Sequence, residues 1–479
     1  MPNVRRACLP ALRNTQYAKC NTEYANTQNV IRNMPIRNTQ YGIYNTFESL
    51  RSRNHDEHPK GYGMSSINLN PQDANFIANP YPIYDELRQT DPLLYRPDKD
   101  DWILTRYADV KFVLRDKRFE FPELLQERAG MSCSWQELFQ PPLNGHKFLQ
   151  LRQKCQGLST LWLVNRSASN HTRIKRIMAD AFSRQAIESW RPKIQSITDM
   201  LVDRIEDKAK VDIIAEFASP LPIMVMSEIL HLPTQDMRRN FNQWAKDIMG
   251  RIEIDVTSVA LERGLMATIG LTRYLYHLIS ERQHKLQDDP LSSLIKAYQQ
   301  GQLNLDELLA NGTFLLLAAI VTTQGLIGKG LLTLLRHPQQ KQTLQRQPQL
   351  ISSTIEECLR YEPPTHFTVR IANDNVLIDG RMGRMIKKGQ KVRLSLAAAN
   401  RDPELFSEAN QFDITRHPNP HLAFGYGRHH CLGAHLGRME AQIAIGTLIK
   451  RLPNLALAKE PEWERGLRTH ALKSLTVLF

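Results

Sequence analysis

The chain of 479 residues is poor in cysteine, has no long uninterrupted apolar run and carries no dense block of one charge. Its six cysteines are few and widely scattered, which argues against a disulfide framework and favours a reducing compartment. The sequence contains no run of about 18 apolar residues, the length that would predict a transmembrane helix. The N-terminus lacks the apolar segment of a signal peptide. These absences predict a cytoplasmic protein that does not insert into a membrane.

The positive charge of the chain is spread thinly. The formal net charge is +13, and residues 1–63 hold nine Lys and Arg against four Asp and Glu, a net of +5, which leaves +8 for the rest. No Lys/Arg block is dense enough to predict a nucleic-acid-binding arm, so no nucleic-acid partner is expected. A diffuse basic excess suits an acidic protein partner.

The first 63 residues differ from everything after them. Asn recurs at positions 14, 21, 26, 33, 38 and 45, in steps that alternate between seven and five residues. The repeats are rich in Asn, Thr and Gln, so they cannot bury enough apolar surface to fold, and they lack the apolar positions of a coiled coil. We predict a low-complexity tail over 1–63, either translated repeat DNA ahead of a start near Met64 or a functional disordered tail, and one large domain over 64–479.

The rest of the chain is predicted to be mainly α-helical with minor β-structure. Amphipathic patterns fill residues 170–300, and short strand patterns appear over 101–107, 375–380, 391–400 and 474–479. The segment 305–338 is apolar almost all round, which predicts a helix that is buried on every side and crosses the middle of the domain.

The stretch FGYGRHHCLGAHLGR, residues 424–438, holds three histidines and one cysteine. A zinc site is disfavoured there because adjacent His-His-Cys side chains cannot all reach one tetrahedral centre, and no second group of ligands is evident. Glycines around Tyr426 permit a tight turn, and Leu432, Leu436 and Met439 predict a helix that begins just after Cys431. A cysteine at a helix N-terminus is stabilised as the thiolate, which is a good axial ligand for haem iron.

The segment FGYGRHHCLG resembles the haem-binding loop of cytochrome P450, F-G-x-G-x-[HR]-x-C-x-G. The resemblance implies the cytochrome P450 fold, a single large domain with haem b between a long central helix and the cysteine loop. It also implies that Cys431 ligates the iron, and that Phe424, Gly425 and Gly433 shape the seat of the cofactor.

A second motif agrees with this family. EECLR places Glu357 and Arg360 on one helix face, and NRDP and FDITR follow in the order and spacing of the family's E-x-x-R helix and meander. By resemblance, Glu357, Arg360 and Arg416 form a buried charge network that supports the thiolate loop, a structural role.

The two propionates of haem need cationic or hydrogen-bonding partners. The resemblance offers His171 and Lys175 in HTRIK, Arg370 in FTVR, and His429 two residues before the cysteine. Lys175 departs from the usual Arg of the family, so a bidentate clamp becomes a single point charge.

The helix over the distal face of the haem departs from the family pattern A-G-x-[DE]-T. This chain has Ala318 and Ala319, then Val321 in place of the acid, and keeps the alcohol as Thr322, which Thr323 follows. The two threonines are the predicted catalytic residues. Since valine carries no proton, three routes stay open: waters held by Thr322, a polar group of the substrate, or chemistry with peroxide or by oxidative coupling.

The resemblance implies a monooxygenase or oxidase that acts on an apolar small molecule, fatty acyl, terpenoid or polyketide-like. No flavin or nicotinamide segment is recognised, so electrons are expected from a ferredoxin or flavodoxin with its reductase. Arg173, Lys175, Arg176 and Arg438 are a candidate docking face. The chain is expected to be a monomer, and the rival interpretation is a non-catalytic haem or ligand binder.

Overall fold

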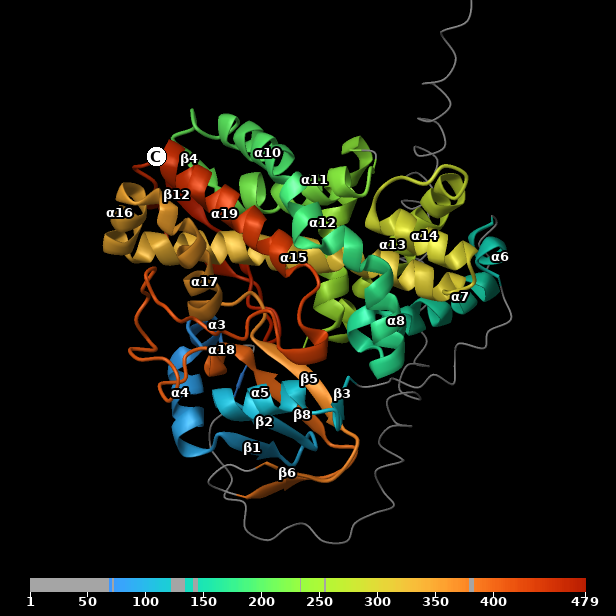
Figure 1. The fold of residues 1–479 in the computed structure, drawn as a ribbon, viewed down its shortest axis with the longest axis horizontal. Coiled ribbons are helices and arrows are strands. Elements are labelled where there is room, and N and C mark those ends of the chain that lie inside the picture. Colours follow the sequence, from blue (N-terminus) through green and yellow to red (C-terminus); the bar gives the residue numbers. More distant parts are fainter. Residues whose placement is uncertain are drawn as a thin grey trace, which may run out of the picture. The chain divides into compact units, whose positions relative to one another are not determined.

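The structure is a computed structural model that describes residues 69–70, 73–121, 134–140, 145–232, 234–253, 256–378 and 383–479. The predicted low-complexity tail, residues 1–63, lies outside the described residues. Ser65–Phe479 form one compact unit. Within this unit, helices gather on one side and a sheet with its covering helices on the other (Figure 1).

Helices make up most of the described chain. The helices before the long central one are α3 (Ala74–Ala78), α4 (Tyr81–Thr90), α5 (Tyr107–Arg115), α6 (Trp135–Phe139), α7 (Gly145–Leu158), α8 (Ala168–Ala179), α9 (Arg184–Ser189), α10 (Arg191–Asp203), α11 (Pro220–Ile229), α12 (Thr234–Arg251), α13 (Ser258–Arg282) and α14 (Pro290–Gln299). Those from the centre onward are α15 (Leu305–Arg336), α16 (Pro338–Arg346), α17 (Ile351–Tyr361), α18 (Leu396–Ala399) and α19 (Ala434–Arg451). The predicted mainly α-helical class with minor β-structure is confirmed.

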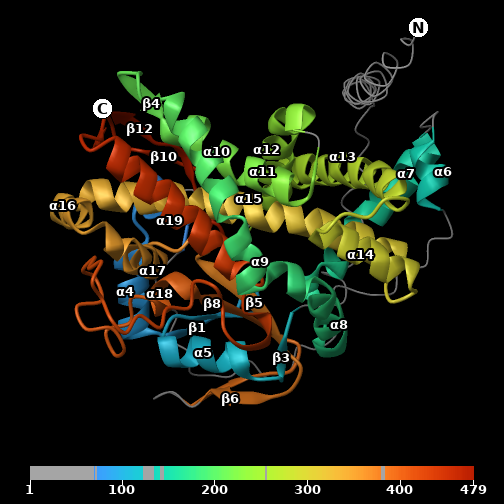
Figure 2. The same ribbon diagram turned by 45° about the horizontal axis from the view of Figure 1, so that its top comes forward.

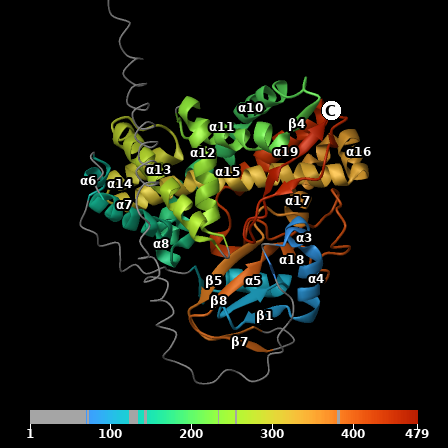
Figure 3. The same ribbon diagram turned by 180° about the vertical axis from the view of Figure 1, so that it is seen from behind.

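The largest sheet has five strands in the order β1-β2-β8-β5-β3. These strands are β1 (Leu93–Arg96), β2 (Asp101–Leu104), β3 (Phe119–Glu120), β5 (Phe367–Ala372) and β8 (Lys391–Ser395). Only β2 and β8 pair in parallel; the other neighbours in this sheet are antiparallel. Seen from behind, α4 and α5 lie beside this sheet (Figure 3).

Three small sheets complete the described β-structure. Their strands are β4 (Lys210–Asp212), β12 (Thr476–Leu478) and β9 (Ala456–Leu457) in the first, β6 (Val376–Ile378) and β7 (Arg384–Ile386) in the second, and β10 (Glu462–Trp463) and β11 (Leu472–Ser474) in the third. The first of them joins the C-terminal strand to residues far upstream, so the end of the chain is fixed to the helical side.

The long helix α15 crosses the molecule, with α19 and α17 beside it (Figure 2). A capping box starts it, because Asn304 accepts from the Glu307 backbone while the Glu307 side chain accepts from the Asn304 backbone. The helix is long and apolar enough to span a membrane by length and composition, but 83% of its most apolar window is buried inside the structure. Its apolar composition is thus explained by packing in the protein core.

Candidate active site

The loop before α19 holds Cys431 by backbone geometry. Gly425 and Gly427 both have φ +72°, a conformation that residues with a Cβ rarely adopt. The Gly425 N–H donates to Leu422 O (2.8 Å), and the Cys431 N–H donates to the Phe424 carbonyl oxygen (2.9 Å), which closes the loop. A Cβ added at Gly433 would meet no atom within 4 Å, so space is open directly beside the cysteine.

The Cys431 thiol has accessible surface, yet burial raises its pKa. The two facts agree if the accessible side of the residue faces the interior of the protein, where water solvates a thiolate poorly. A hydrogen bond from the Gly433 backbone, and the charges of Arg438 and Lys175, lower the pKa and partly offset the burial. A positive ion bound to the sulfur would favour the thiolate further.

Three side chains that can carry a positive charge, His171, Arg370 and His429, meet near this loop, and no described residue pairs a carboxylate with them. The ring centroids of His171 and His429 lie 4.3 Å apart, and those of Phe121 and His429 lie 5.0 Å apart. The Arg370 guanidinium lies over the Phe121 ring, 3.9 Å from its centroid. Arg370 is only 2% exposed and donates just to Val369 O and Thr368 Oγ1. Among the residues that the structure describes, none forms a hydrogen bond with the buried Nδ1 atoms of His171 and His429.

Burial is the main cause of the low pKa values in this cluster, and neighbouring positive charges lower them further. Burial, followed by the charge of Arg370, lowers the pKa of His429 to about 2. Burial and the charge of Lys175 lower that of His171 to about 4, and burial lowers that of Arg370 to about 9. A buried cation is stable only beside an anion, so these side chains fit a group that carries carboxylates.

Lys175 is placed differently from the other predicted propionate partners. Its ammonium donates to the carbonyl oxygens of Arg428 (3.2 Å) and His430 (3.4 Å), on the cysteine loop itself. Lys175 therefore fastens α8 to the loop, and an Arg at this position would present a wider fork of donors.

The residues present fit a haem. An open side at Gly433 gives room for a flat ring, Cys431 offers a thiolate, and the unpaired nitrogens of His171 and His429 beside Arg370 suit its carboxylates. Cofactor-binding roles for these residues, and for Phe424 and Gly425, stay predictions.

One face of α15 is partly accessible in the middle of an otherwise buried helix. Within α15, which is described throughout, the residues between Glu307 and Leu334 are buried except Phe314, Ala318, Ala319 and Thr322. These four recur at helical spacing and share one face. The Thr322 hydroxyl donates to Ala318 O (2.7 Å), so its lone pairs remain free to accept a hydrogen bond.

Val321 and Thr323 point away from that face. Val321 is 9% exposed and belongs to the large hydrophobic core, and Thr323 is 5% exposed. The helix runs without interruption through Ala319, where the family pattern has glycine. The structure thus places Thr322 at the accessible face and leaves the other predicted catalytic residue, Thr323, in the core.

Glu357, Arg360 and Arg416 lie together as one buried cluster. Arg360 donates two hydrogen bonds to the Glu357 carboxylate (2.7 and 2.8 Å), and both residues are fully buried. The Arg416 Nε atom and the Asp413 N–H also donate to Glu357, at 3.3 and 2.9 Å. Because Arg360 also reaches the Ala409 carbonyl oxygen (2.7 Å), the cluster fixes the segment that leads to the cysteine loop.

The basic residues predicted to dock a redox partner are largely engaged within the chain. Arg173 and Arg438 are each paired with a glutamate, at 2.5 and 2.7 Å, and Lys175 is bound to the cysteine loop. Arg176 is exposed. The charge of Arg173 and Arg438 is therefore partly neutralised at the surface.

A loop that presents one thiolate beside room for a flat ring defines the class of haem-thiolate oxidoreductases. The family can be stated more narrowly. The sequence profile of the cytochrome P450 family matches residues 151–463, and the chain belongs to this family. It is an oxidoreductase of the monooxygenase type, and the family implies a haem cofactor.

Several bacterial members of the family are similar along most of their length. A biotin biosynthesis cytochrome P450 of Bacillus subtilis (strain 168) is 35% identical over 413 residues, which cover 85% of this chain and 98% of that protein. Polyketide biosynthesis cytochrome P450 PksS of the same strain is 32% identical over 427 residues, or 86% and 99% of the two chains. The solved complex of P450BioI with hexadec-9Z-enoic acid ligated acyl carrier protein superposes with a TM-score of 0.76, 33% identity and 85% and 100% coverage.

The sequence analysis did not predict two groups of residues, one beside the cysteine loop and one around Glu362. Phe121 lies between His429 and Arg370, and no motif marks it. A buried group around Glu362, with Lys329 at 0% exposure, was missed as well. A single lysine inside the apolar segment 305–338 was a signal for it, because a buried lysine needs a partner.

Proposed function

We propose that this chain is a haem b monooxygenase that oxidises an apolar small molecule, with electrons supplied by separate proteins. The observation that carries the proposal is the pairing of Cys431, at an open glycine-lined loop, with the buried side chains of Arg370, His171 and His429, to which the described residues offer no carboxylate. Haem, when bound there, supplies the iron at which dioxygen is reduced and cleaved.

The chain's own residues hold the cofactor from two sides. The Cys431 thiolate would ligate the iron, and the hydrogen bond from the Gly433 N–H would lower the basicity of the sulfur. His171, Arg370 and His429 bind the propionates, and Lys175 closes α8 onto the loop. The Glu357 cluster keeps the loop rigid, since its carboxylate binds both α17 and the segment after it.

Thr322 is the proposed catalytic alcohol on the distal side. Its hydroxyl proton is committed to Ala318 O, so its oxygen accepts a hydrogen bond from water or substrate and positions a proton donor at the accessible face. Val321 cannot add an acid to this relay. The buried valine favours a second candidate, oxidation with peroxide or oxidative coupling, which needs fewer protons from the protein.

The substrate is proposed to be a fatty acyl, terpenoid or polyketide-like molecule. Phe314, Ala318 and Ala319 give the accessible face of α15 an apolar surface. Among similar structures, one holds an acyl carrier protein bearing a hexadecenoyl chain, and another, CYP267B1, holds myristic acid. We therefore place fatty acyl chains, free or carrier-bound, first among the candidates.

We further propose that a ferredoxin or flavodoxin with its reductase delivers the electrons and that the protein works in the cytoplasm as a monomer. The diffuse excess of positive charge supports an acidic electron donor. The exposed Arg176 on α8 is a candidate contact.

The test measures product formation with a surrogate ferredoxin and reductase. The candidate substrates are a fatty acid, an acyl carrier protein loaded with the same chain, a steroid and a macrolide precursor. Spin-shift titration with each compound ranks binding first. Oxidised product with reductant supports the proposal, product with peroxide alone supports the second candidate, and binding without any product in either assay supports the non-catalytic binder.

A further inference from the structure

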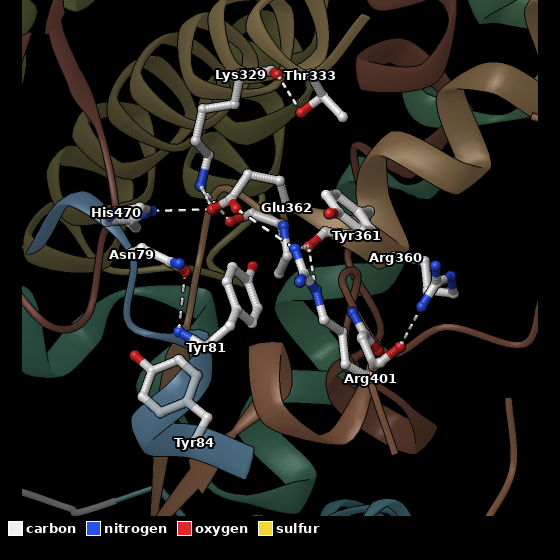
Figure 4. A network of polar contacts seen from close by, with 12 residues as sticks. Asn79, Tyr81, Tyr84, Lys329, Thr333, Arg360, Tyr361, Glu362, Arg401 and His470 are labelled. Atoms are coloured by element: carbon white, nitrogen blue, oxygen red, sulfur yellow. Dashed lines mark hydrogen bonds and ion pairs between the residues drawn. The ribbon is translucent and has the colours of Figure 1, made fainter. Parts of the chain in front are cut away.

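A second cluster of titratable side chains lies at the C-terminal end of α17, outside the cysteine loop (Figure 4). The Glu362 Oε1 atom lies 2.9 Å from His470 Nδ1, 3.2 Å from His366 Nε2 and 3.3 Å from Lys329 Nζ. Both histidines are nearly fully buried, and so is the lysine. Nothing in the proposed monooxygenase chemistry uses these residues.

Each histidine ring is fixed by a partner outside the cluster. His470 Nε2 lies 2.6 Å from the Ile77 carbonyl oxygen, and the ring stacks on Trp463 at 4.1 Å. His366 Nδ1 lies 3.2 Å from the Tyr84 hydroxyl. Histidines that bind metals commonly donate their other ring nitrogen to a carbonyl or hydroxyl oxygen in this way, which sets the orientation of the ring.

The contact between His470 and Glu362 needs a proton or a metal ion between the two atoms. Ile77 O only accepts, so Nε2 carries a proton, and a neutral ring then turns the Nδ1 lone pair toward the Glu362 carboxylate. Two acceptors 2.9 Å apart repel unless a second ring proton or a metal ion lies between them.

We propose that Glu362, His366 and His470 form a binding site for a divalent ion of the zinc type. Their three ligand atoms lie within 4.8 Å of one another. With bonds of about 2.0–2.1 Å, tetrahedral geometry separates the ligand atoms by roughly 3.3 Å, close to the observed 2.9 and 3.2 Å. A cavity of about 430 Å³, lined by Glu362, Arg401 and Trp463 among others, offers room for water as the fourth ligand.

The ion has a structural role that goes beyond the proposed function. It joins the end of α17 to the start of β5, the strand that also carries Arg370, and to the C-terminal segment with His470. Through the Ile77 carbonyl oxygen, which His470 contacts, it also fixes α3. Binding there stabilises the frame around the haem without touching the reacting atoms.

Lys329 is the group that opposes this ion, since its ammonium lies 3.3 Å from the same carboxylate oxygen. It also donates to the Pro363 carbonyl oxygen at 2.5 Å. Removal of its charge provides a gain-of-binding test: Lys329→Met fills the same buried space and removes the repulsion, so it is expected to bind zinc about tenfold more tightly than the unaltered protein.

The experiment measures zinc and iron together in tag-free, haem-loaded protein after equilibrium dialysis against micromolar Zn²⁺. One zinc per chain in addition to the haem iron is expected. His470→Gln and His366→Gln are each expected to weaken binding by about 100-fold or more. The matched control is His337→Gln, because His337 lines the same cavity but bonds to Thr333 O instead, and it should keep the zinc.

Anomalous scattering at the zinc edge locates the ion, and a peak between Glu362, His366 and His470 supports the proposal. Chelation should lower the melting temperature of the unaltered protein but not that of His470→Gln. If neither the unaltered protein nor Lys329→Met binds zinc at micromolar concentration, the cluster is a hydrogen-bonded charge group and the proposal is wrong. That outcome leaves the monooxygenase proposal unaffected, because turnover needs only haem iron.

Discussion

The two sides of the proposed haem site differ in how closely they keep the family pattern. On the side of Cys431, hydrogen bonds close the loop and hold the Glu357 network, and His171, His429 and Arg370 meet through ring contacts. On the side of α15, the alcohol Thr322 remains, but the acid is replaced by Val321, which packs into the core. The part proposed to hold the cofactor departs from the family pattern only at Lys175, whereas the part proposed to deliver protons lacks its acid. We therefore expect this enzyme to differ from other members of the family mainly in how protons reach its active site.

The largest effect is expected from Cys431→Ser, which removes the thiolate and tests the side that holds the cofactor. An alcohol is a poor ligand for haem iron, so the reduced carbon monoxide spectrum characteristic of thiolate ligation and all turnover should be lost. His430→Gln is the control, since this neighbouring ring has no proposed role. A thiolate-type spectrum in the serine variant would rule out Cys431 as the ligand.

Glu357→Gln tests whether the buried network supports the loop. It leaves Arg360 as a buried charge without its full partner, which costs about 3–5 kcal/mol, so the free energy of unfolding and the haem content should both fall. Glu188→Gln is the control, because its pair with Arg191 is exposed to solvent and its loss is expected to change neither quantity measurably. Equal losses in the two variants would contradict the proposed role of Glu357.

Val321→Glu tests the altered side. A positioned acid contributes roughly 10²–10⁴-fold to proton transfer, but Thr322 is already present, so we expect a smaller rise of about threefold in product formed per reductant consumed. Val321→Gln has the same shape without the proton and corrects for the cost of a polar group at a buried position. Unchanged coupling in the glutamate variant would mean that protons reach the site by another route.

Lys175→Arg should have a modest effect on the side that holds the cofactor. Arginine can keep the contacts with the loop carbonyls and add a planar fork toward a propionate, a gain of about 0.5–1 kcal/mol that would slow haem dissociation a fewfold. Lys175→Gln should speed it instead. Faster haem loss from the arginine variant would show that the lysine is fitted to the loop alone.

Deletion of residues 2–63 should have the smallest effect. The predicted tail has too little apolar content to add to a core, so melting temperature and turnover are expected to stay the same when the chain begins at Met64. A drop in either quantity would show that the tail belongs to the working protein.

Sequence patterns predicted what lies close together along the chain, and the family resemblance added groups that packing brings together, such as Glu357 with Arg416, but neither predicted the group around Glu362. The cysteine loop is contiguous, so its residues could be assigned a place before the fold was known. Lys329, Glu362 and His470 are far apart in sequence, and no spacing rule connects them. Helical phase also decided that Thr322 lies on the accessible face while Val321 and Thr323 lie in the core, which a motif alone does not reveal.

The most direct test of the central claim is turnover of a fatty acyl substrate under isotopically labelled dioxygen, with a surrogate ferredoxin and reductase and with catalase present. The account predicts that one labelled oxygen atom appears in the product, with much reductant consumed unproductively because Val321 supplies no proton. Product that forms only after peroxide is added in the absence of catalase, and that carries no label from dioxygen, would contradict the claim that this chain is an oxygen-dependent monooxygenase.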